Sequence, residues 1–153
     1  MKIEFPASEQ EKLSAQLVGK FASIRNGVQL KMAERMKKIT QDNLGIFGVD
    51  RPIEWAELSP SYARKVGRTY ATLLVTGKLR DAIKVDTANG AEGVKVAASN
   101  DDVPYARAHQ LGYPPNNLPA RPYFPMDRSG TVIESARLEI EQVAREALAE
   151  ALL

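Results

Sequence analysis

The sequence contains no cysteine and only one histidine, His109, among its 153 residues. Without cysteine the chain can form no disulfide and offers no thiolate for a metal site or for nucleophilic catalysis. A zinc site is not expected either, because such sites usually draw on cysteine or on several histidines. For the adjacent carboxylates Asp101 and Asp102, an acidic loop tip is the preferred interpretation and a carboxylate metal site is the alternative.

The sequence also lacks the short motifs that mark common cofactor and catalytic sites. It contains no GxxxxGK phosphate loop, no GxGxxG dinucleotide fingerprint and no GxSxG nucleophile elbow. We therefore expect no cofactor, no bound metal and no catalytic residues, which favours a protein that is not an enzyme.

Long apolar runs are missing as well. No stretch approaches the roughly 18 consecutive apolar residues of a membrane-spanning helix. The start, MKIEFPASEQEKL, lacks the apolar centre of a signal peptide. We expect a soluble chain without a membrane partner, made in the cytoplasm. The net charge of +2 is small for a nucleic-acid-binding protein, whose basic patches usually raise the charge much further.

What is present is a long amphipathic pattern near the start of the chain. Ser8 and Glu11 match a capping box at a helix start. Asn26 and Gly27 predict a bend or break midway, since glycine costs about 1 kcal/mol relative to alanine within a helix. The other face is basic, which we interpret as a solvated surface, with a surface for an acidic partner as the alternative. The apolar stripe comprises Leu13, Leu17, Phe21, Ile24, Val28, Met32, Met36 and Ile39.

A second amphipathic pattern lies at the end of the chain. Thr131 and Glu134 match another capping box. This helix is net acidic, so pairing with the basic first helix, within or between subunits, is an alternative to two independent solvated faces. Its apolar positions are Val132, Ala136, Ile140, Val143, Ala147 and Ala151.

Between these helices the sequence predicts smaller elements. Ser59 and Pro60 suit the start of a short helix, and Gly67 suits its end. Trp55 lies just upstream and is expected to pack against this helix. The side chains expected to point inward are Tyr62, Ala63 and Val66.

The next segments predict a hairpin. The apolar run at 73–75 fits helix or strand, and Thr76-Gly77 should end it. Alternating residues then predict antiparallel strands at about 82–88 and 93–98 around an Asn-Gly turn. A further alternating stretch at 2–5 fits a strand or an arm. The expected fold is a single α+β domain over 1–153, with long N- and C-terminal helices packed on this small antiparallel sheet.

A proline-rich loop, AHQLGYPPNNLPARPYFP at 108–125, precedes the last helix. We expect the His109 side chain to bond to backbone and fix a turn after a short helical segment that Gly112 closes. Phe124 is expected to anchor the loop in the core. The alternatives are a small hydrolase that uses His109 as a general base, a PxxP ligand, or aromatic residues beside Arg121 that stack on nucleic acid. Hydroxyls near His109 in sequence are Ser99, Ser129 and Tyr105.

Four segments, at 55–66, 73–83, 105–112 and 118–124, together resemble one family: the Mu-like phage virion morphogenesis proteins, also called tail completion proteins. In their order they carry a tryptophan before an LSP helix start, a TG-L-R turn, a YA and HQ-G pair, and a proline-arginine-proline motif followed by an aromatic residue. The matching residues are Trp55, Ser59, Pro60, Thr76, Gly77, Tyr105, His109, Gly112, Pro122 and Phe124.

The resemblance implies a structural protein of a tailed phage or prophage that acts at the tail end or at the head–tail joint. It implies a ring of identical subunits in the virion, tail or connector proteins as partners, and the bacterial cytoplasm as the place of assembly. No catalytic residues come with it. Because proline lowers the ordering cost of binding, we expect residues 113–125 to form a subunit or tail contact. The interface residues in this hypothesis are Pro115, Asn116, Arg121 and Tyr123.

Overall fold

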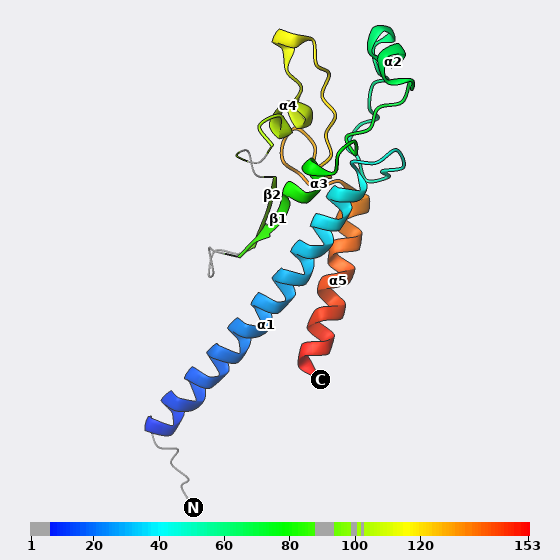
Figure 1. Cartoon of the computed structure of the whole chain (residues 1–153). Helices are drawn as coiled ribbons and strands as arrows, with labels where there is room; N and C mark the ends of the chain where they lie inside the picture. Colours follow the sequence, from blue (N-terminus) through cyan, green and yellow to red (C-terminus); the bar gives the residue numbers. More distant parts are fainter. Residues whose placement is uncertain (1–6, 88–93, 99–100, 102) are drawn as a thin grey trace, which may run out of the picture.

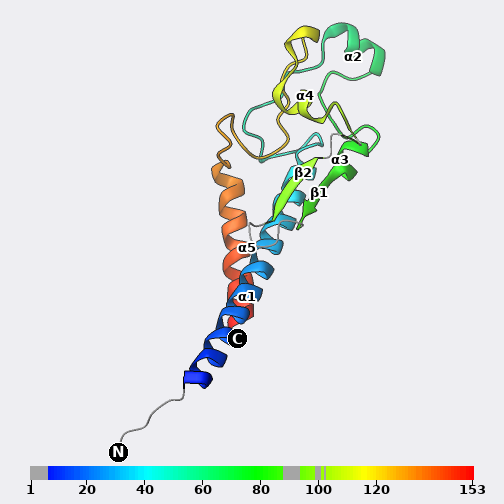
Figure 2. The ribbon, with the colours of Figure 1, turned by 90° about the vertical axis from the view of Figure 1, so that its left-hand side faces the viewer.

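The computed structural model describes residues 7–87, 94–98, 101 and 103–153. Two helices dominate it: α1 (Ala7–Asp42) and α5 (Glu134–Leu152). They run antiparallel, and a small β-hairpin lies against α1 on the side away from α5 (Figures 1 and 2). The predicted α+β fold, with long terminal helices on a small antiparallel sheet, is confirmed.

Helix α1 is continuous over 36 residues, or about 54 Å at 1.5 Å per residue. The predicted bend at Gly27 is wrong, because extending a helix that is already formed on both sides outweighs the modest cost of one glycine. The helix is already formed at Ala7, so Ser8 is a helical residue and not the predicted cap. The predicted strand or arm at 2–5 lies outside the described residues.

Half of α1 packs against α5. Ile39, Ala136 and Ile140 form the buried centre of this contact, with Met32 and Met36 packed around it. Two ion pairs cross the helices at its edge, Lys31 with Glu150 and Arg35 with Glu139. The pairing of basic and acidic helices, an alternative in the sequence, therefore occurs within the chain.

The start of α5 differs from the prediction. Its N-cap is Ile133, and no side chain caps it. Thr131 belongs to the preceding turn, where its backbone N–H donates to Asp127 Oδ1 at 3.0 Å. The capping box is wrong because Asp127 occupies this turn, while Glu134 pairs with Arg137 one turn later.

The hairpin consists of β1 (Ile83–Asp86) and β2 (Lys95–Ala98), paired antiparallel from Ile83 opposite Ala98 to Asp86 opposite Lys95. Burial alternates along both strands as the sequence predicts, since one face packs on α1. The predicted Asn-Gly turn at 89–90 lies outside the described residues.

Three short helices join these parts: α2 (Pro60–Val66), α3 (Lys78–Ala82) and α4 (Ala106–Leu111). Gly67 ends α2 at φ 69°, as its left-handed conformation favours glycine. The run at 73–75 is neither helix nor strand. Helix α2 projects from the body and has no fully buried residue (Figure 1); of the three side chains predicted to point inward, Ala63 and Val66 are half-buried and Tyr62 is exposed.

The main core lies where α3, α4, the hairpin and the end of α1 meet. Trp55 belongs to this core and not to a contact with α2, which corrects its predicted position. The buried members are Leu44, Trp55, Leu79, Ala82, Ile83, Val103, Ala106 and Tyr123.

Candidate functional site

The proline-rich segment 113–125, called the connector below, is held at its C-terminal end by hydrogen bonds from three directions. Trp55 Nε1 donates to the carbonyl oxygen of Pro122 at 2.9 Å. The Gln110 side-chain oxygen accepts the backbone N–H groups of Tyr123 and Phe124, at 2.9 and 3.1 Å. The backbone N–H of Arg121 donates to the carbonyl oxygen of His109 at 2.6 Å. The connector is therefore fixed to α4 and to the segment before α2.

Tyr123 is the aromatic residue that anchors the connector. Its side chain is 1% exposed, and its hydroxyl donates to the carbonyl oxygen of Ala106 at 3.3 Å. Burial raises the pKa of Tyr123 to about 12. Its assignment as an interface residue is therefore wrong for this fold, because the connector directs Tyr123 inward. Phe124, the predicted anchor, is half-buried and packs at the edge of the same core.

The other predicted contact residues of the connector lie at its tip. Pro115 and Asn116 are exposed within a short 3-10 turn, Pro114–Asn116. Gly112, which directly precedes the connector, has φ 79°, and a Cβ there would lie 3.0 Å from the backbone nitrogen of Ala120. This close approach explains why glycine suits the position and why the two arms of the connector lie against each other.

A cavity of about 790 Å³ lies between the connector and the segment that leads into α2. We call it the His109 cavity. Residues from four separate parts of the sequence line it. The sequence identified several of them as candidate site residues, but it did not predict that they lie around one cavity. The predicted site residues that line it are Ser59, Thr76, Tyr105, His109, Asn116 and Arg121.

The single histidine is half-buried in the wall of this cavity. Its Nδ1 is buried and has no hydrogen-bond partner within the described part of the chain. The Tyr105 ring lies edge-on to it, with ring centroids 5.7 Å apart. Burial, and then the positive charge of Arg121, lower the pKa of His109. The predicted side-chain bond to backbone is wrong, because the backbone carbonyl of His109 makes that contact instead.

The hydrolase alternative required a hydroxyl in hydrogen-bond reach of His109 within a concave pocket. The cavity meets the second requirement. Among the described residues no hydroxyl bonds to Nδ1, and Tyr105 meets the imidazole through its ring. Ser99, one of the hydroxyls near His109 in sequence, lies outside the described residues.

Arg121 is buried and forms no ion pair within the described part of the chain. Its side chain is 7% exposed, and Nη2 donates a long bond of 3.4 Å to the carbonyl oxygen of Ala56. Nε has no partner within the described ranges, and the same holds for Nε of Arg68, another cavity residue. Burial lowers the pKa of Arg121, and the nearby Tyr62 opposes this shift.

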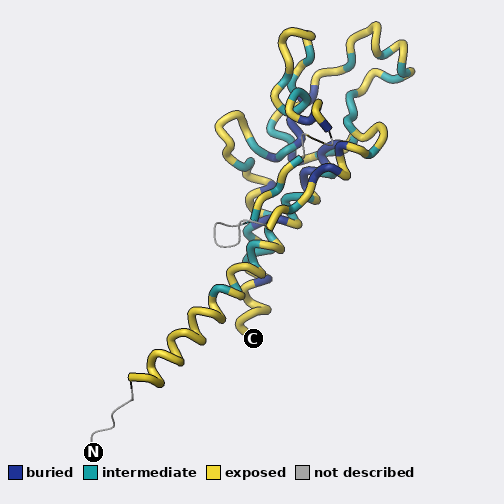
Figure 3. The backbone as a smooth tube through the Cα atoms, turned by 60° about the vertical axis from the view of Figure 1, so that its left-hand side comes forward, coloured by how far each residue is buried: buried dark blue, intermediate teal, exposed yellow. Residues whose placement is uncertain are grey.

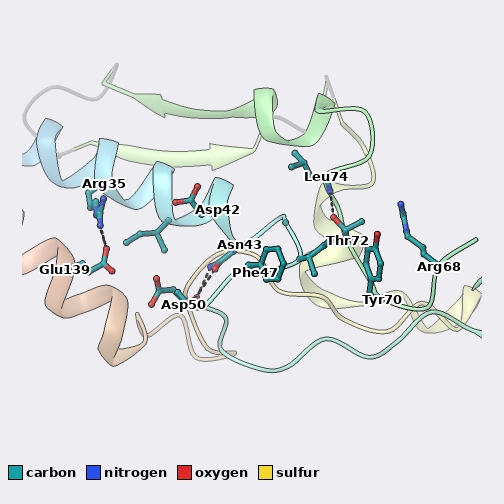
Figure 4. A pocket seen from close by; sticks show the side chains of 14 residues that line it. Arg35, Asp42, Asn43, Phe47, Asp50, Arg68, Tyr70, Thr72, Leu74 and Glu139 are labelled. Carbon is teal, nitrogen blue, oxygen red and sulfur yellow. Dashed lines mark hydrogen bonds and ion pairs between the residues drawn. The ribbon is translucent and has the colours of Figure 1, made fainter. Parts of the chain in front are cut away.

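A second concavity, of about 670 Å³, lies between the end of α1 and segment 45–50 (Figure 4). Asn43 organises it: the side-chain nitrogen donates to the carbonyl oxygens of Asp50, at 2.8 Å, and of Tyr123, at 3.1 Å. Asp50 N–H donates back to the Asn43 side-chain oxygen at 3.2 Å. Sequence reasoning missed Asn43, since an asparagine at the end of a helix looks like an ordinary cap.

The N-terminal half of α1 projects beyond the end of α5 (Figure 3). Leu13, Leu17 and Phe21, which we call the α1 stripe, are 47%, 47% and 63% exposed. They continue the face that α5 covers further along the helix. The sequence predicted the eight-residue apolar row to which they belong, but not that these three members would be exposed.

Ion pairs within the chain involve four of the seven basic residues of α1. Lys31 and Arg35 pair with α5, Lys37 with Glu34, and Lys38 with Asp42. This leaves less free positive charge for the nucleic-acid alternative, which depends on unpaired cations.

Among the residues that the structure describes, no three histidine or carboxylate side chains gather as metal ligands. The described helices include none that is long and apolar enough to cross a membrane. Comparisons with family models, curated proteins and solved structures found no match to this chain.

Proposed function

We propose that this chain is a structural protein of a tailed phage or prophage that completes the tail or joins head to tail. It acts through contacts between identical subunits and with other tail or connector proteins, and not by catalysis. It is made in the bacterial cytoplasm and ends in the virion. The observation that carries the proposal is the α1 stripe, a row of large apolar side chains left open on a projecting helix.

Such a stripe suits a subunit that becomes buried on assembly. Isolated exposed apolar residues are normal on soluble proteins, but a contiguous row of them marks an interaction surface. Leu13, Leu17 and Phe21 follow one another at four-residue steps, so they lie on one face of α1. A rigid helix that carries this face can hold a neighbouring subunit at a fixed angle, as closure of a ring requires.

The proposed occupant of the α1 stripe is α5 of a neighbouring copy. On α5, Leu148 and Leu152 are 45% and 63% exposed and lie one turn apart. The exposed part of α1 carries Lys12, Lys20 and Arg25 against Glu9 and Glu11, and of the five glutamates of α5 only Glu146 forms no ion pair among the described residues. The contact would therefore be mainly apolar, and it would join two different surfaces, which is the head-to-tail contact from which rings are built.

The resemblance to tail completion proteins gives the proposal its biological setting. The motif segments at 55–66, 105–112 and 118–124 are linked through the Trp55–Pro122 and Gln110 hydrogen bonds. This supports treating the motif as one structural unit that holds the connector in place.

The test is to locate the protein after induction of the phage. Particles from the bacterium that carries the gene are separated on a density gradient, and the chain is quantified in each fraction by mass spectrometry. We expect it to sediment with intact tails or whole particles at a fixed number of copies per particle. Recovery only in the soluble fraction, with tails present elsewhere in the gradient, would contradict the proposal.

A further inference from the structure

Three side chains that line the His109 cavity each carry a buried nitrogen atom without a hydrogen-bond partner. These atoms are His109 Nδ1, Arg121 Nε and Arg68 Nε, and they are all of the buried unpartnered side-chain atoms found within the described ranges. Buried polar groups are nearly always hydrogen-bonded, because an unpaired one costs about 1–3 kcal/mol. All three side chains border one cavity, so a polar ligand in that cavity would lie beside them.

The charge of such a ligand follows from the two guanidinium groups. Arg121 is more than nine-tenths buried, and in the described part of the chain neither it nor Arg68 forms an ion pair. A buried cation without a counter-charge is costly, so an anion gains from entering the cavity. Arginine presents planar donors that match the two oxygens of a carboxylate.

The remaining lining favours a carboxylate on a protein over a phosphate on a nucleic acid. Leu58, Leu73 and Leu118 give the wall apolar patches that suit a peptide side chain. Glu57 also lines the cavity, and its negative charge would repel a polyphosphate more than a single carboxylate.

We infer that the His109 cavity binds an aspartate or glutamate side chain of a partner protein, with Arg121 and Arg68 as the charged ligands and His109 as a third polar contact. The carboxylate site stands on this geometry alone. Only the statement that the partner is a tail or connector protein, or a second copy of this chain, rests on the proposed function.

The probe is N-acetyl-aspartate N-methylamide, which mimics an aspartate within a chain, and its asparagine counterpart is the matched control. The imidazole signals of the single histidine and the Nε–H signals of the arginines are followed by NMR at constant pH and ionic strength. We expect saturable shifts at His109 and Arg121 with the aspartate compound. The asparagine compound should bind at least tenfold more weakly. Equal binding of the two compounds, or no shift with either, would overturn the inference.

Variants separate the site from general charge effects. Arg68→Gln should weaken aspartate binding about tenfold and keep the fold, because Arg68 is only half-buried. Arg64→Gln, on the exposed side of α2, should leave binding unchanged. Equal weakening by both variants would contradict a built site. Inorganic phosphate that binds more tightly than the aspartate compound would overturn the choice of a carboxylate.

This binding experiment uses the isolated protein and is independent of any particle. If the aspartate compound binds but the protein is absent from virions, the carboxylate site stands and the proposed function is refuted. If the protein is present in virions but the aspartate compound does not bind, only the carboxylate site is refuted.

Discussion

The indole nitrogen of Trp55 donates a hydrogen bond to the carbonyl oxygen of Pro122, 2.9 Å away and 67 positions later in the chain. Through this bond the segment before α2 and the connector, the two sides of the His109 cavity, are joined at their base. The geometry of the cavity therefore depends on a residue that does not line it.

Replacing Trp55 by phenylalanine should destabilise the protein by about 2 kcal/mol, since it leaves a buried carbonyl unpaired and removes part of a buried ring. Urea unfolding measures the change in the free energy of unfolding. Tyr113→Phe is the matched control. Tyr113 is 47% exposed, so loss of its hydroxyl should change the free energy of unfolding little. A loss below about 0.5 kcal/mol for Trp55→Phe would show that this bond does not stabilise the connector.

Gln110 is the second anchor of the connector. Gln110→Met keeps the size of the side chain but leaves the N–H groups of Tyr123 and Phe124 without an acceptor, so we expect a loss of about 2–4 kcal/mol. The hydrogen-exchange rates of these two amides should rise by the factor that corresponds to this loss of free energy. Gln142→Met on the exposed face of α5 serves as the control. Unchanged exchange at 123 and 124 would contradict the assigned role.

The stability of the protein should fall on acidification because of His109. Its pKa in the folded state lies below the ordinary 6.5, so the unfolded chain takes up the proton first. The free energy of unfolding is therefore highest above about pH 6.5 and decreases as the pH falls through the lowered pKa. The ionisable and charged groups around His109 in the cavity are Arg121, Arg68, Tyr62, Tyr105 and Glu57.

Urea unfolding of the parent protein and of His109→Gln between about pH 5 and 8 measures this dependence. The variant should lose the acid slope. Asp127 and Glu134, whose pKa values are lowered by hydrogen bonds from Ser129 and Arg137, lose their contributions only at more acidic pH. Parallel curves for the two proteins would rule out His109 as the source.

The ion pair of Arg35 with Glu139 is half-exposed and should contribute about 0.5 kcal/mol to stability. A double-mutant cycle with Arg35→Gln and Glu139→Gln measures the coupling, which should shrink at high salt. A coupling near zero at low salt would mean that this ion pair does not help to hold α1 and α5 together.

Elements of strong local character could be predicted from the sequence. The hairpin followed from alternation, and the ends of α2 and α4 followed from Gly67 and Gly112. These features depend on neighbours in the chain, as do the four-residue steps of the apolar stripe on α1.

Features that depend on distant partners were missed. Gly27 does not bend α1, and Thr131 serves the Asp127 turn, because neighbouring structure decided both. The burial of Tyr123 depends on α4, and the role of Asn43 depends on a loop and on the connector. Hydrophobic periodicity reports local structure, so it does not predict such contacts between residues far apart in the sequence.

The most direct test of the account replaces residues of the α1 stripe and counts the protein in purified particles. Leu17→Asp and Phe21→Asp should leave the free energy of unfolding within about 0.5 kcal/mol of the parent, since both side chains are exposed. Ala15→Asp is the matched control, because Ala15 is exposed and lies on the opposite face of the helix. The account predicts that the two stripe variants are lost from particles while the Ala15 variant remains. Incorporation of all three at the parent level would contradict it.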